Sequence, residues 1–485
     1  MKTIDNLLVG VEVVQIKGNT AVEIKKICFD TREVEALSLF VAQKGTKVDG
    51  HQFVSQAIEK GAVAVVVEKM PKQLLDTVCY IQVKRSSFAL ALMAANFYDN
   101  PSQKLQLIGI TGTNGKTTTV TLLYRLMMAM HKKTGLLSTI ENRINDKIYP
   151  ATHTTADSVA LNRMLAEMVA AGCQYCFMEV SSHAIVQDRI VGLHFKGAIF
   201  SNLTHDHLDY HKTFSAYRDA KKMFFDQLPT TAFALTNIDD ANGDFMLQNT
   251  KAKQYRYSLQ NARADFKAKI GECNFNGLNL KIDNKDVWFR LIGKFNAYNL
   301  LAIYGTAVLL GFDREEVLMQ MSNLEAAEGR FFTLRGKGII VIVDYAHTPD
   351  ALKNVLETIN NIVSKEEEIV TVVGCGGDRD KTKRPEMAEI ACLLSHRVIL
   401  TSDNPRSENP HDIIEDMLKG VSKAYERNLL VIEDRKQAIK AAIMQASPNT
   451  VILIAGKGHE KYQDIAGVKH HFDDVEVAEE YLKDK

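Results

Sequence analysis

The stretch Gly109-Ile110-Thr111-Gly112-Thr113-Asn114-Gly115-Lys116-Thr117-Thr118-Thr119 decides how the middle of this chain folds. An apolar run over residues 105–108 precedes it and predicts a strand, and apolar residues spaced along one helix face follow it. A glycine turn between a strand and a helix brings backbone N–H groups and a helix N-terminus together, which suits phosphate. Lys116 would then reach the β- and γ-phosphates, and the hydroxyl of Thr117 would ligate magnesium.

The loop departs from the strict P-loop pattern in one respect. That pattern has a glycine five residues before Gly115, where this chain has Ile110, and the glycine here is Gly112. The loop is therefore shorter than in ordinary ATPases. The alternative is a tight glycine turn without a ligand, and the Gly-Lys-Thr ending favours the phosphate site.

Composition excludes several classes of protein. A chain of 485 residues predicts about three domains, and 46% hydrophobic residues are enough for packed cores. The 59 basic and 59 acidic residues balance, so there is no electrostatic footprint for nucleic acid or an anionic membrane. Apolar runs are only strand-length, and no signal-peptide layout is present. Seven scattered cysteines are typical of a reducing compartment. We expect a cytoplasmic monomer.

The order of predicted elements divides the chain into three α/β domains. Residues 1–98 alternate short strands with helices, and the Asn-Pro turn at 100–101 is a natural linker. Residues 99–329 contain the phosphate loop and a parallel sheet, with an antiparallel appendage over about 251–292. Residues 330–485 alternate strands and helices as in a doubly wound, Rossmann-like domain.

Four buried strands of the last region end in polar or glycine-rich turns. These turns begin at residues 344, 374, 402 and 456. In an open parallel sheet the carboxyl ends of the strands lie on one edge, where ligands bind. The sequence therefore predicts a binding cleft at this edge.

Two segments of the middle region carry candidate metal ligands. Glu179 ends a buried strand, and a carboxylate there could hold magnesium beside the phosphate loop. Histidines 205, 207 and 211 could form a zinc site, but no paired-cysteine or HExxH ligand set accompanies them. From the sequence pattern alone, we expect Lys221 to be a solvent-exposed charge on an amphipathic helix. We likewise expect Thr155 to cap a helix.

Several motifs together resemble the Mur ligase family. They are the short phosphate loop, Met178 to His183, Asn202 to His211, Asp344 to Pro349 and Asp403 to Arg406, and the resemblance covers essentially the whole chain in order. It implies ATP-driven amide formation in peptidoglycan precursor synthesis. ATP would phosphorylate a carboxylate to an acyl phosphate, which the amine of an incoming amino acid would attack. Catalysis would be mostly placement and charge neutralisation.

The resemblance also implies a nucleotide and metal site. Lysine in the family's Tyr-x-x-Ala-Lys pattern is carbamylated by carbon dioxide, and Lys221 fits that register. One magnesium ion would be held by Thr117 and Glu179 and a second by His207 and the Lys221 carbamate, and Lys116, Glu179, His207 and Lys221 would form the catalytic set. The implied ATP contacts are Gly112, Thr113, Asn114, Gly115, Lys116, Thr117, Thr118, Asn299, Arg330, Asp344 and His347.

Two substrate sites follow from the same resemblance. The UDP substrate, UDP-N-acetylmuramoyl-L-alanyl-D-glutamate, would contact Thr31, Thr154, Thr155, Ser181, Gln187 and Arg189. The Asp-Asn-Pro-Arg loop is similar to that of the members that add meso-2,6-diaminopimelate. That amino acid would contact Arg379, Asp403, Asn404, Pro405, Arg406, Gly456 and Glu460. Arg406 would bind its distal carboxylate and Glu460 its distal ammonium.

Three other functions compete with this interpretation. A folylpolyglutamate synthetase performs the same chemistry on another acceptor, but those enzymes begin near the phosphate loop, whereas here a domain precedes it. A P-loop ATPase would hydrolyse ATP without an acceptor amino acid. A non-catalytic nucleotide-binding module would have no need of Lys116, Glu179 and Lys221 together.

Overall fold

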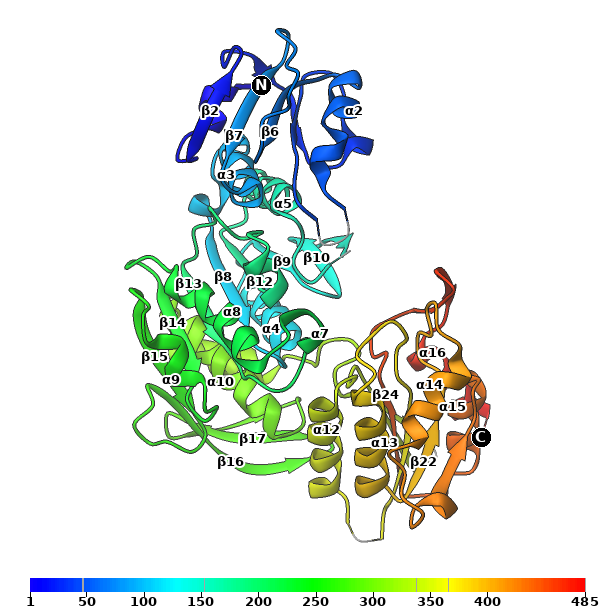
Figure 1. The fold of residues 1–485 in the computed structure, drawn as a ribbon. Coiled ribbons are helices and arrows are strands. Elements are labelled where there is room, and N and C mark those ends of the chain that lie inside the picture. The colour runs from blue at the N-terminus through cyan, green and yellow to red at the C-terminus, as the bar shows by residue number, and fades with distance from the viewer. Residues whose placement is uncertain (46–47, 152, 337, 365, 485) are drawn as a thin grey trace.

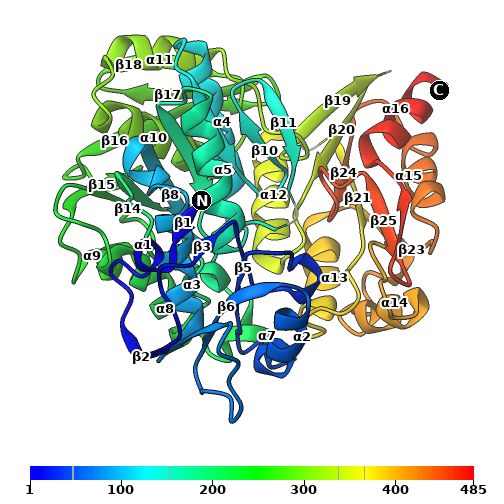
Figure 2. The same ribbon diagram turned by 90° about the horizontal axis from the view of Figure 1, so that it is seen from above.

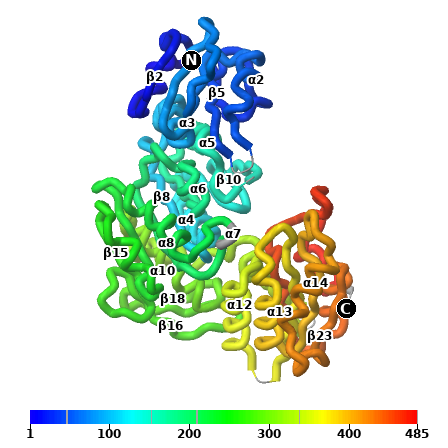
Figure 3. The backbone as a smooth tube through the Cα atoms, in the orientation of Figure 1, coloured from blue at the N-terminus to red at the C-terminus, as the bar shows by residue number. Residues whose placement is uncertain are grey.

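The computed structural model describes residues 1–485 except 46, 47, 152, 337, 365 and 485. Three large sheets follow one another along the chain, and each is covered by helices (Figure 1). The tube drawing in Figure 3 shows the same three bodies in chain order, with the middle one between the other two. The fold is α/β, as the sequence predicts. Among the described residues, no helix is long and apolar enough to cross a membrane.

The first sheet is small and mostly parallel. Its order is β2-β7-β6-β5-β4, and only β2 runs antiparallel to its neighbour. Lys25 separates the short strand β3 Glu23–Ile24 from β4, and its N–H donates to the Leu37 carbonyl. The elements are β2 Val13–Lys17, β4 Lys26–Cys28, β5 Ser38–Val41, α2 Val54–Glu59, β6 Ala62–Val67, β7 Cys79–Val83 and α3 Ser86–Phe97.

The middle sheet has eleven strands in the order β11-β10-β9-β12-β8-β13-β14-β15-β16-β17-β18. In the order of the sheet, the strands between β9 and β16 run parallel to one another. At one edge β10 and β11, and at the other β17 and β18, are antiparallel to their neighbours. The antiparallel appendage predicted over about 251–292 is confirmed for β16–β18 but is wrong for β15, which runs parallel to β14, and the polar hairpin β10–β11 was not predicted. The strands are β8 Gln106–Thr111, β9 Thr134–Leu137, β10 Glu141–Ile144, β11 Lys147–Pro150, β12 Tyr175–Glu179, β13 Gly197–Phe200, β14 Phe233–Asn237, β15 Lys253–Ser258, β16 Phe266–Asn274, β17 Gly277–Ile282 and β18 Lys285–Phe289.

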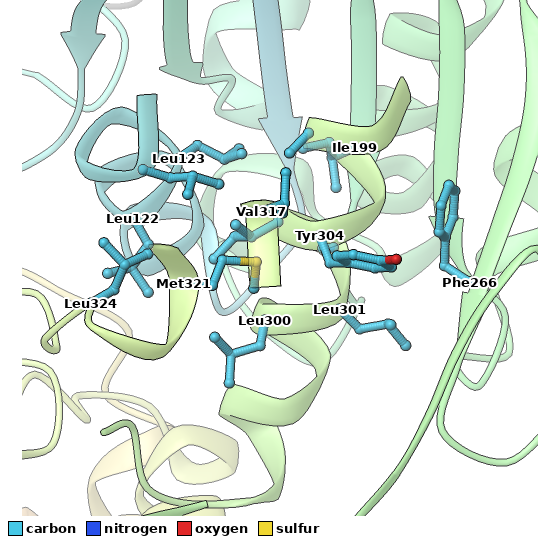
Figure 4. Close-up of a cluster of buried hydrophobic side chains, with 14 of the residues drawn as sticks. Leu122, Leu123, Ile199, Phe266, Leu300, Leu301, Tyr304, Val317, Met321 and Leu324 are labelled. Carbon is cyan, nitrogen blue, oxygen red and sulfur yellow. The ribbon is translucent and has the colours of Figure 1, made fainter. Parts of the chain in front are cut away.

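Helices bury both faces of this sheet. One core joins α4 Lys116–Ala129, α10 Lys294–Leu309 and α11 Arg314–Ser322 to the sheet through side chains such as Leu122, Leu301 and Tyr304 (Figure 4). The other core packs against the opposite face. Its helices are α5 Ser158–Ala170, α6 Ser182–Val186, α8 Phe214–Asp226 and α9 Gly243–Leu247. These helices hold the strand ends rigidly beside the phosphate loop.

The third sheet has the order β19-β20-β24-β21-β22-β23, parallel except for β19. Helices α12, α13 and α14 cover one face and α15 and α16 the other, as the view from above shows (Figure 2). The elements are β19 Phe332–Gly336, β20 Ile339–Asp344, α12 Pro349–Ile362, β21 Glu368–Val373, α13 Lys383–Leu394, β22 Arg397–Leu400, α14 Pro410–Leu418, β23 Leu429–Val431, α15 Arg435–Met444, β24 Thr450–Ala455 and α16 Asp474–Asp484. A hairpin, β25 Tyr462–Ile465 and β26 Val468–His471, follows β24.

Candidate functional site

The phosphate loop connects β8 to the N-terminus of α4, as its sequence predicts. Gly112 and Gly115 both have positive φ, +153° and +89°. A side chain at Gly112 would overlap the Ser201 hydroxyl, and a Cβ at Gly115 would lie 2.5 Å from Oδ1 of Asn299. Only glycine fits at both positions, so the loop can pack closely against Ser201 and Asn299.

Two lysines converge on one carbonyl of this loop. Nζ of Lys116 donates to the Gly112 and Thr113 carbonyls at 2.9 and 2.8 Å, and Nζ of Lys221 donates to the Gly112 carbonyl at 2.8 Å. Burial lowers the pKa of Lys116. Burial, reinforced by repulsion from Lys116, holds the pKa of Lys221 well below its usual range. Within the described part of the chain, neither ammonium forms an ion pair. The pair therefore favours an anionic ligand.

A carboxylate and two imidazoles lie beside these lysines. Oδ2 of Asp206 is 3.4 Å from Nε2 of His207. Although burial acts in the opposite direction, the charges of His207, His347 and Lys116 lower the pKa of Asp206. Loss of water contact in the cleft lowers the pKa of His207 to about 4 and that of His347 to about 4. Both imidazoles are therefore neutral near pH 7, the form that ligates metal ions.

Glu179 lies at the end of β12, the strand next to β8. Its Oε1 accepts from the backbone N–H of Thr139 at 2.8 Å. The Thr155 hydroxyl donates to the backbone carbonyl of Glu179 at 2.8 Å and accepts from the N–H of Ser181 at 3.1 Å. Arg189 Nη1 donates to the Thr155 carbonyl at 2.7 Å. These bonds fix Glu179 beside the hydroxyls of Thr155 and Ser181 and the guanidinium of Arg189. Those three side chains are predicted to bind the UDP substrate.

Residues of the third sheet reach the phosphate loop across the junction. Nη2 of Arg330 donates to the Thr117 hydroxyl at 3.3 Å. Oδ2 of Asp350, at the start of α12, accepts from Nδ2 of Asn114 at 2.8 Å and from the Thr204 hydroxyl at 3.1 Å. Asp344 is buried and accepts from the N–H of Phe331 at 2.7 Å, which fixes the chain next to Arg330. The nucleotide end of the site therefore depends on two parts of the chain.

The carboxyl ends of β22 and β24 form a second polar cluster. Nδ2 of Asn404 donates to Oε2 of Glu460 at 2.7 Å, and Nζ of the buried Lys457 donates to Oδ1 of Asn404 at 3.0 Å. Burial, reinforced by the carboxylate of Asp403, raises the pKa of Glu460. This cluster carries both a carboxylate and amide donors, which suits an amino acid.

Arg406 has an unusual backbone conformation at the rim of this cluster. Its φ is +52°, in the left-handed region that few non-glycine residues occupy. The β25–β26 hairpin holds it there, since the N–H of Arg406 donates to the Asp464 carbonyl at 2.9 Å and its carbonyl accepts from Ala466 at 2.7 Å. Nη1 of Arg406 donates to the Gly377 carbonyl at 2.7 Å. The guanidinium thus lies beside Gly376, with Arg379 on the same turn.

One cleft of about 1260 Å³ joins these groups. Predicted site residues that line it include most of the phosphate loop, Glu179, His207, Lys221 and both arginines of the amino-acid cluster. Six predicted residues do not line it: Thr31, Gly112, Gln187, Asn299, Asp344 and Pro405. Asn299 lies beneath Gly115 and donates to Asn296 at 3.0 Å, so its side chain supports the loop from below.

The structure adds residues that the sequence prediction missed. Asp206 and Asp350 lie beside the phosphate loop, Lys383 donates to the His347 carbonyl at 2.9 Å, and Lys457 and His459 lie in the turn before Glu460. Asp206 lies inside the quoted motif Asn202 to His211, and Lys457 and His459 lie in the turn predicted to begin at residue 456, so their positions gave a signal. Asp350 and Lys383 gave none, because only the tertiary structure brings them to the cleft.

Among the described residues, this site contains no preformed set of metal ligands. Among the described residues, no group of three or more His, Cys, Asp or Glu side chains could hold a metal ion, so the zinc interpretation of the histidine segment has no support. Magnesium instead binds through one or two carboxylates together with substrate phosphates and water. Glu179 and the Thr117 hydroxyl line the cleft beside the loop and fit that requirement.

Three family descriptions match the chain in succession. "Mur ligase family, catalytic domain" matches residues 23–98, "Mur ligase middle domain" residues 110–307, and "Mur ligase, glutamate ligase domain" residues 329–458. A relative from Cytophaga hutchinsonii is 57% identical over 99% of both chains. This chain belongs to the Mur ligase family. The relative is named UDP-N-acetylmuramoyl-L-alanyl-D-glutamate–2,6-diaminopimelate ligase.

Two further Mur ligases support the assignment. A protein of the same name from Bacteroides fragilis is 52% identical over 98% of both chains. A solved structure of a ligase with that name has a TM-score of 0.70 and 32% identity, and covers 100% of this chain and 99% of its own. The match at residues 23–98 lies before the phosphate loop, in the region that the folylpolyglutamate interpretation leaves unexplained.

Proposed function

We propose that this protein is an ATP-dependent ligase that joins meso-2,6-diaminopimelate to the D-glutamate γ-carboxylate of UDP-N-acetylmuramoyl-L-alanyl-D-glutamate. The reaction is a step of peptidoglycan precursor synthesis. The observation that carries the proposal is one cleft with lysines on a phosphate loop at one end and a carboxylate–amide–arginine cluster at the other. The names of the full-length relatives support the choice of substrates.

The phosphate end would place ATP and the acceptor carboxylate. Lys116 and the exposed backbone of the loop would hold the phosphates, with Arg330, Asn299, Asp344 and His347 completing the nucleotide site. The γ-phosphoryl group would pass to the glutamate carboxylate and give an acyl phosphate plus ADP. The incoming amine would then attack the acyl carbon, and phosphate would leave with both electrons of the C–O bond. Positioning and charge neutralisation supply most of the acceleration in such transfers.

Magnesium would be held by Glu179, Thr117, His207 and carbamylated Lys221, and would neutralise the charge on the transferred phosphoryl group. The chemistry of Lys221 fits carbamylation. Its pKa lies well below the usual range through burial and through repulsion from Lys116, so the neutral amine is available. Its nitrogen would bond to the carbon of carbon dioxide and lose a proton, which converts a cation into an anion. An anion there would pair with Lys116 instead of repelling it.

The two substrates would meet within the cleft. Thr154, Thr155, Ser181 and Arg189 would bind the UDP substrate from the middle sheet, with Thr31 and Gln187 from outside the cleft. Diaminopimelate would bind at Arg379, Asp403 to Arg406, Gly456 and Glu460. We also propose domains 1–98, 99–329 and 330–485, and a monomer in the cytoplasm, where the seven free cysteines would stay reduced.

The test is phosphate release by the purified enzyme with ATP, magnesium and the UDP-dipeptide, measured with and without candidate amino acids. We expect release only when diaminopimelate is added, and a product heavier by one diaminopimelate residue in mass spectrometry. Release that needs no amino acid would favour the P-loop ATPase. Release with a folate acceptor would favour the folylpolyglutamate synthetase.

A further inference from the structure

Lys457 is a buried lysine for which the reaction above provides no role. It follows β24 and has no exposed side-chain surface. Its Nζ donates to Oδ1 of Asn404 at 3.0 Å, lies 3.5 Å from Oε2 of Glu460 and faces the ring of Tyr462. A lysine that is fully removed from water is costly unless its charge is compensated. Its position between two predicted substrate ligands therefore calls for an explanation.

The hydrogen bonds around Asn404 permit only one orientation of its amide. Oδ1 accepts from Nζ of Lys457 and from the backbone N–H of Asp464, the latter at 2.9 Å. Both partners are donors that cannot accept, so the oxygen must face them. The NH2 group consequently points toward Glu460, to which it donates at 2.7 Å. Lys457 and the hairpin thus decide which atom of Asn404 faces the amino-acid site.

The charges around Glu460 show a second effect of Lys457. Asp403, Glu460 and Asp474 are acidic, and Lys457 and Arg435 are basic, so these five side chains have one excess negative charge when all are ionised, without Arg379 and Arg406 at the rim. One negative charge complements one ammonium group. Burial and the Asp403 carboxylate raise the pKa of Glu460, and Lys457 opposes them. The charged or titratable groups that face Glu460 are Asp403, Lys457, Arg435, Tyr345 and Tyr462.

We propose that Lys457 is a positioning residue of the amino-acid site, which holds the NH2 group of Asn404 on the side of Glu460 and opposes the protonation of Glu460. The cluster then presents a carboxylate to an ammonium, while Asn404 and Arg406 present donors to a carboxylate. That pattern recognises the zwitterionic head group of an α-amino acid. The inference rests on the proposed function and adds a specificity-determining residue to it.

The first experiment measures the steady-state constants of Lys457→Met between pH 6 and pH 9. The KM for diaminopimelate should rise roughly tenfold to a hundredfold, since a buried charge loses its partner. The KM values for ATP and the UDP-dipeptide should stay within about twofold of wild type. The rise of the diaminopimelate KM on acidification should begin at a higher pH in the variant, because Glu460 protonates earlier without Lys457. Lys436→Met, the same change at an exposed lysine of α15, is the control.

A second variant tests the amide orientation without changing the size of a side chain. In Asn404→Asp both donors to Oδ1 keep an acceptor, so folding should be preserved, but an oxygen now faces Glu460. Diaminopimelate use should fall roughly a hundredfold or more. If Asn404→Asp used diaminopimelate normally, the amide orientation would have no role.

Each result decides between the proposals. A wild-type enzyme that ignores diaminopimelate overturns the proposed function. A wild type that uses it, together with a folded Lys457→Met whose diaminopimelate KM and pH profile are unchanged, overturns only the role of Lys457. Equal losses for all three substrates would make Lys457 a merely structural residue and would also overturn it. If Lys457→Met does not fold, Asn404→Asp still tests whether the orientation of the Asn404 amide matters for the use of diaminopimelate.

Discussion

The two ends of the cleft differ in whether their positively charged side chains have partners of opposite charge. At the phosphate loop, the half-buried Lys116 and the buried Lys221 both donate to the Gly112 carbonyl, neither forms an ion pair with a described residue, and burial lowers the pKa of both. At the amino-acid end, Lys457 lies between Asn404 and Glu460, and Arg435 is bonded to Asp474 at 2.7 Å. Among the described residues, the two lysines of the first site have no acidic partner, whereas Lys457 and Arg435 at the second are paired with Glu460 and Asp474.

This difference follows from the ligands that we propose. A triphosphate brings several negative charges, and carbamylation would turn Lys221 itself into an anion, so a site for them can hold two neighbouring lysine amines whose pKa is lowered in the free protein. A zwitterionic amino acid brings no net charge, so its site must be nearly balanced before binding. Unpaired charge at the phosphate loop should cost stability in the free enzyme, and paired charge at the other end should not. The predictions below test this contrast, beginning with the largest effect.

Lys116→Ala should abolish ligation. Loss of a cation that stabilises a transferred phosphoryl group lowers kcat by a factor on the order of 10³–10⁵. The melting temperature of the free protein should not fall, because the variant no longer buries this unpaired ammonium. Phosphate release and differential scanning fluorimetry provide the two measurements. Normal turnover in a folded variant would show that this loop is not the ATP site.

Lys221→Ala should lower kcat by about 10³, the upper end for removal of one group that stabilises transition-state charge. High bicarbonate should not restore activity, whereas a small carboxylic acid should restore part of it by replacing the carbamate. Mass spectrometry of the wild type under carbon dioxide should locate the added mass on Lys221. Lys222→Ala is the matched control, since Lys222 is the next residue of α8 and pairs with Asp226. Wild-type activity in Lys221→Ala would contradict the metal-bridging role.

Arg406→Ala should impair the use of diaminopimelate but leave ATP binding unchanged. Arg406 is only half-buried and Arg379 remains nearby, so we expect the low end of the range for a lost charge pair, about 2–3 kcal/mol or roughly 30- to 150-fold in kcat/KM. Wild type should discriminate against lysine, which lacks the distal carboxylate, and the variant should discriminate less. Arg427→Ala, at an exposed arginine of the same region, should behave as wild type. Equal use of both amino acids by the wild type would defeat the assignment.

Glu408→Gln should have the smallest effect, on stability alone. Glu408 accepts from the buried Arg384 at 2.8 Å, from Lys381 at 3.1 Å and from the N–H of Asp378 at 2.6 Å, and these bonds support the turn beside Arg406. They lower the pKa of Glu408 from 4.5 to about 2, with the Arg384 bond as the largest cause.

A group whose pKa is lowered on folding stabilises the protein above its unfolded pKa, and this contribution is lost as the pH falls through the folded pKa. The free energy of unfolding of the wild type should therefore exceed that of Glu408→Gln by about 1–2 kcal/mol at pH 7. The difference should shrink below pH 4.5 and disappear near pH 2. Urea unfolding across this range provides the measurement. A constant difference at all pH values would mean that the charge of Glu408 is not responsible.

The sequence by itself determined the fold class and the location of the phosphate loop. The glycines and the Lys116-Thr117 ending lie within one short segment, and their geometry is local, because a strand and a helix flank them directly. The four buried strand ends of the last region were predictable for a similar reason: parallel strands must end on one edge. Each role that depends on the ligand, such as that of Lys221, came from resemblance and stays a prediction.

Only the tertiary structure decided which groups meet across the chain. Asp350 reaches Asn114 over 236 positions, and Lys457 reaches Asn404 over 53, so neither contact leaves a local signal in the sequence. The family resemblance implies that Asn299 contacts ATP, which stays a prediction, and only the structure shows that its side chain lies beneath Gly115. The lowered pKa of Lys221 results from burial and from Lys116, which lies on a different helix and far away in the sequence. Desolvation and long-range pairing are properties of the assembled fold, and the charge state of this cleft depends on both.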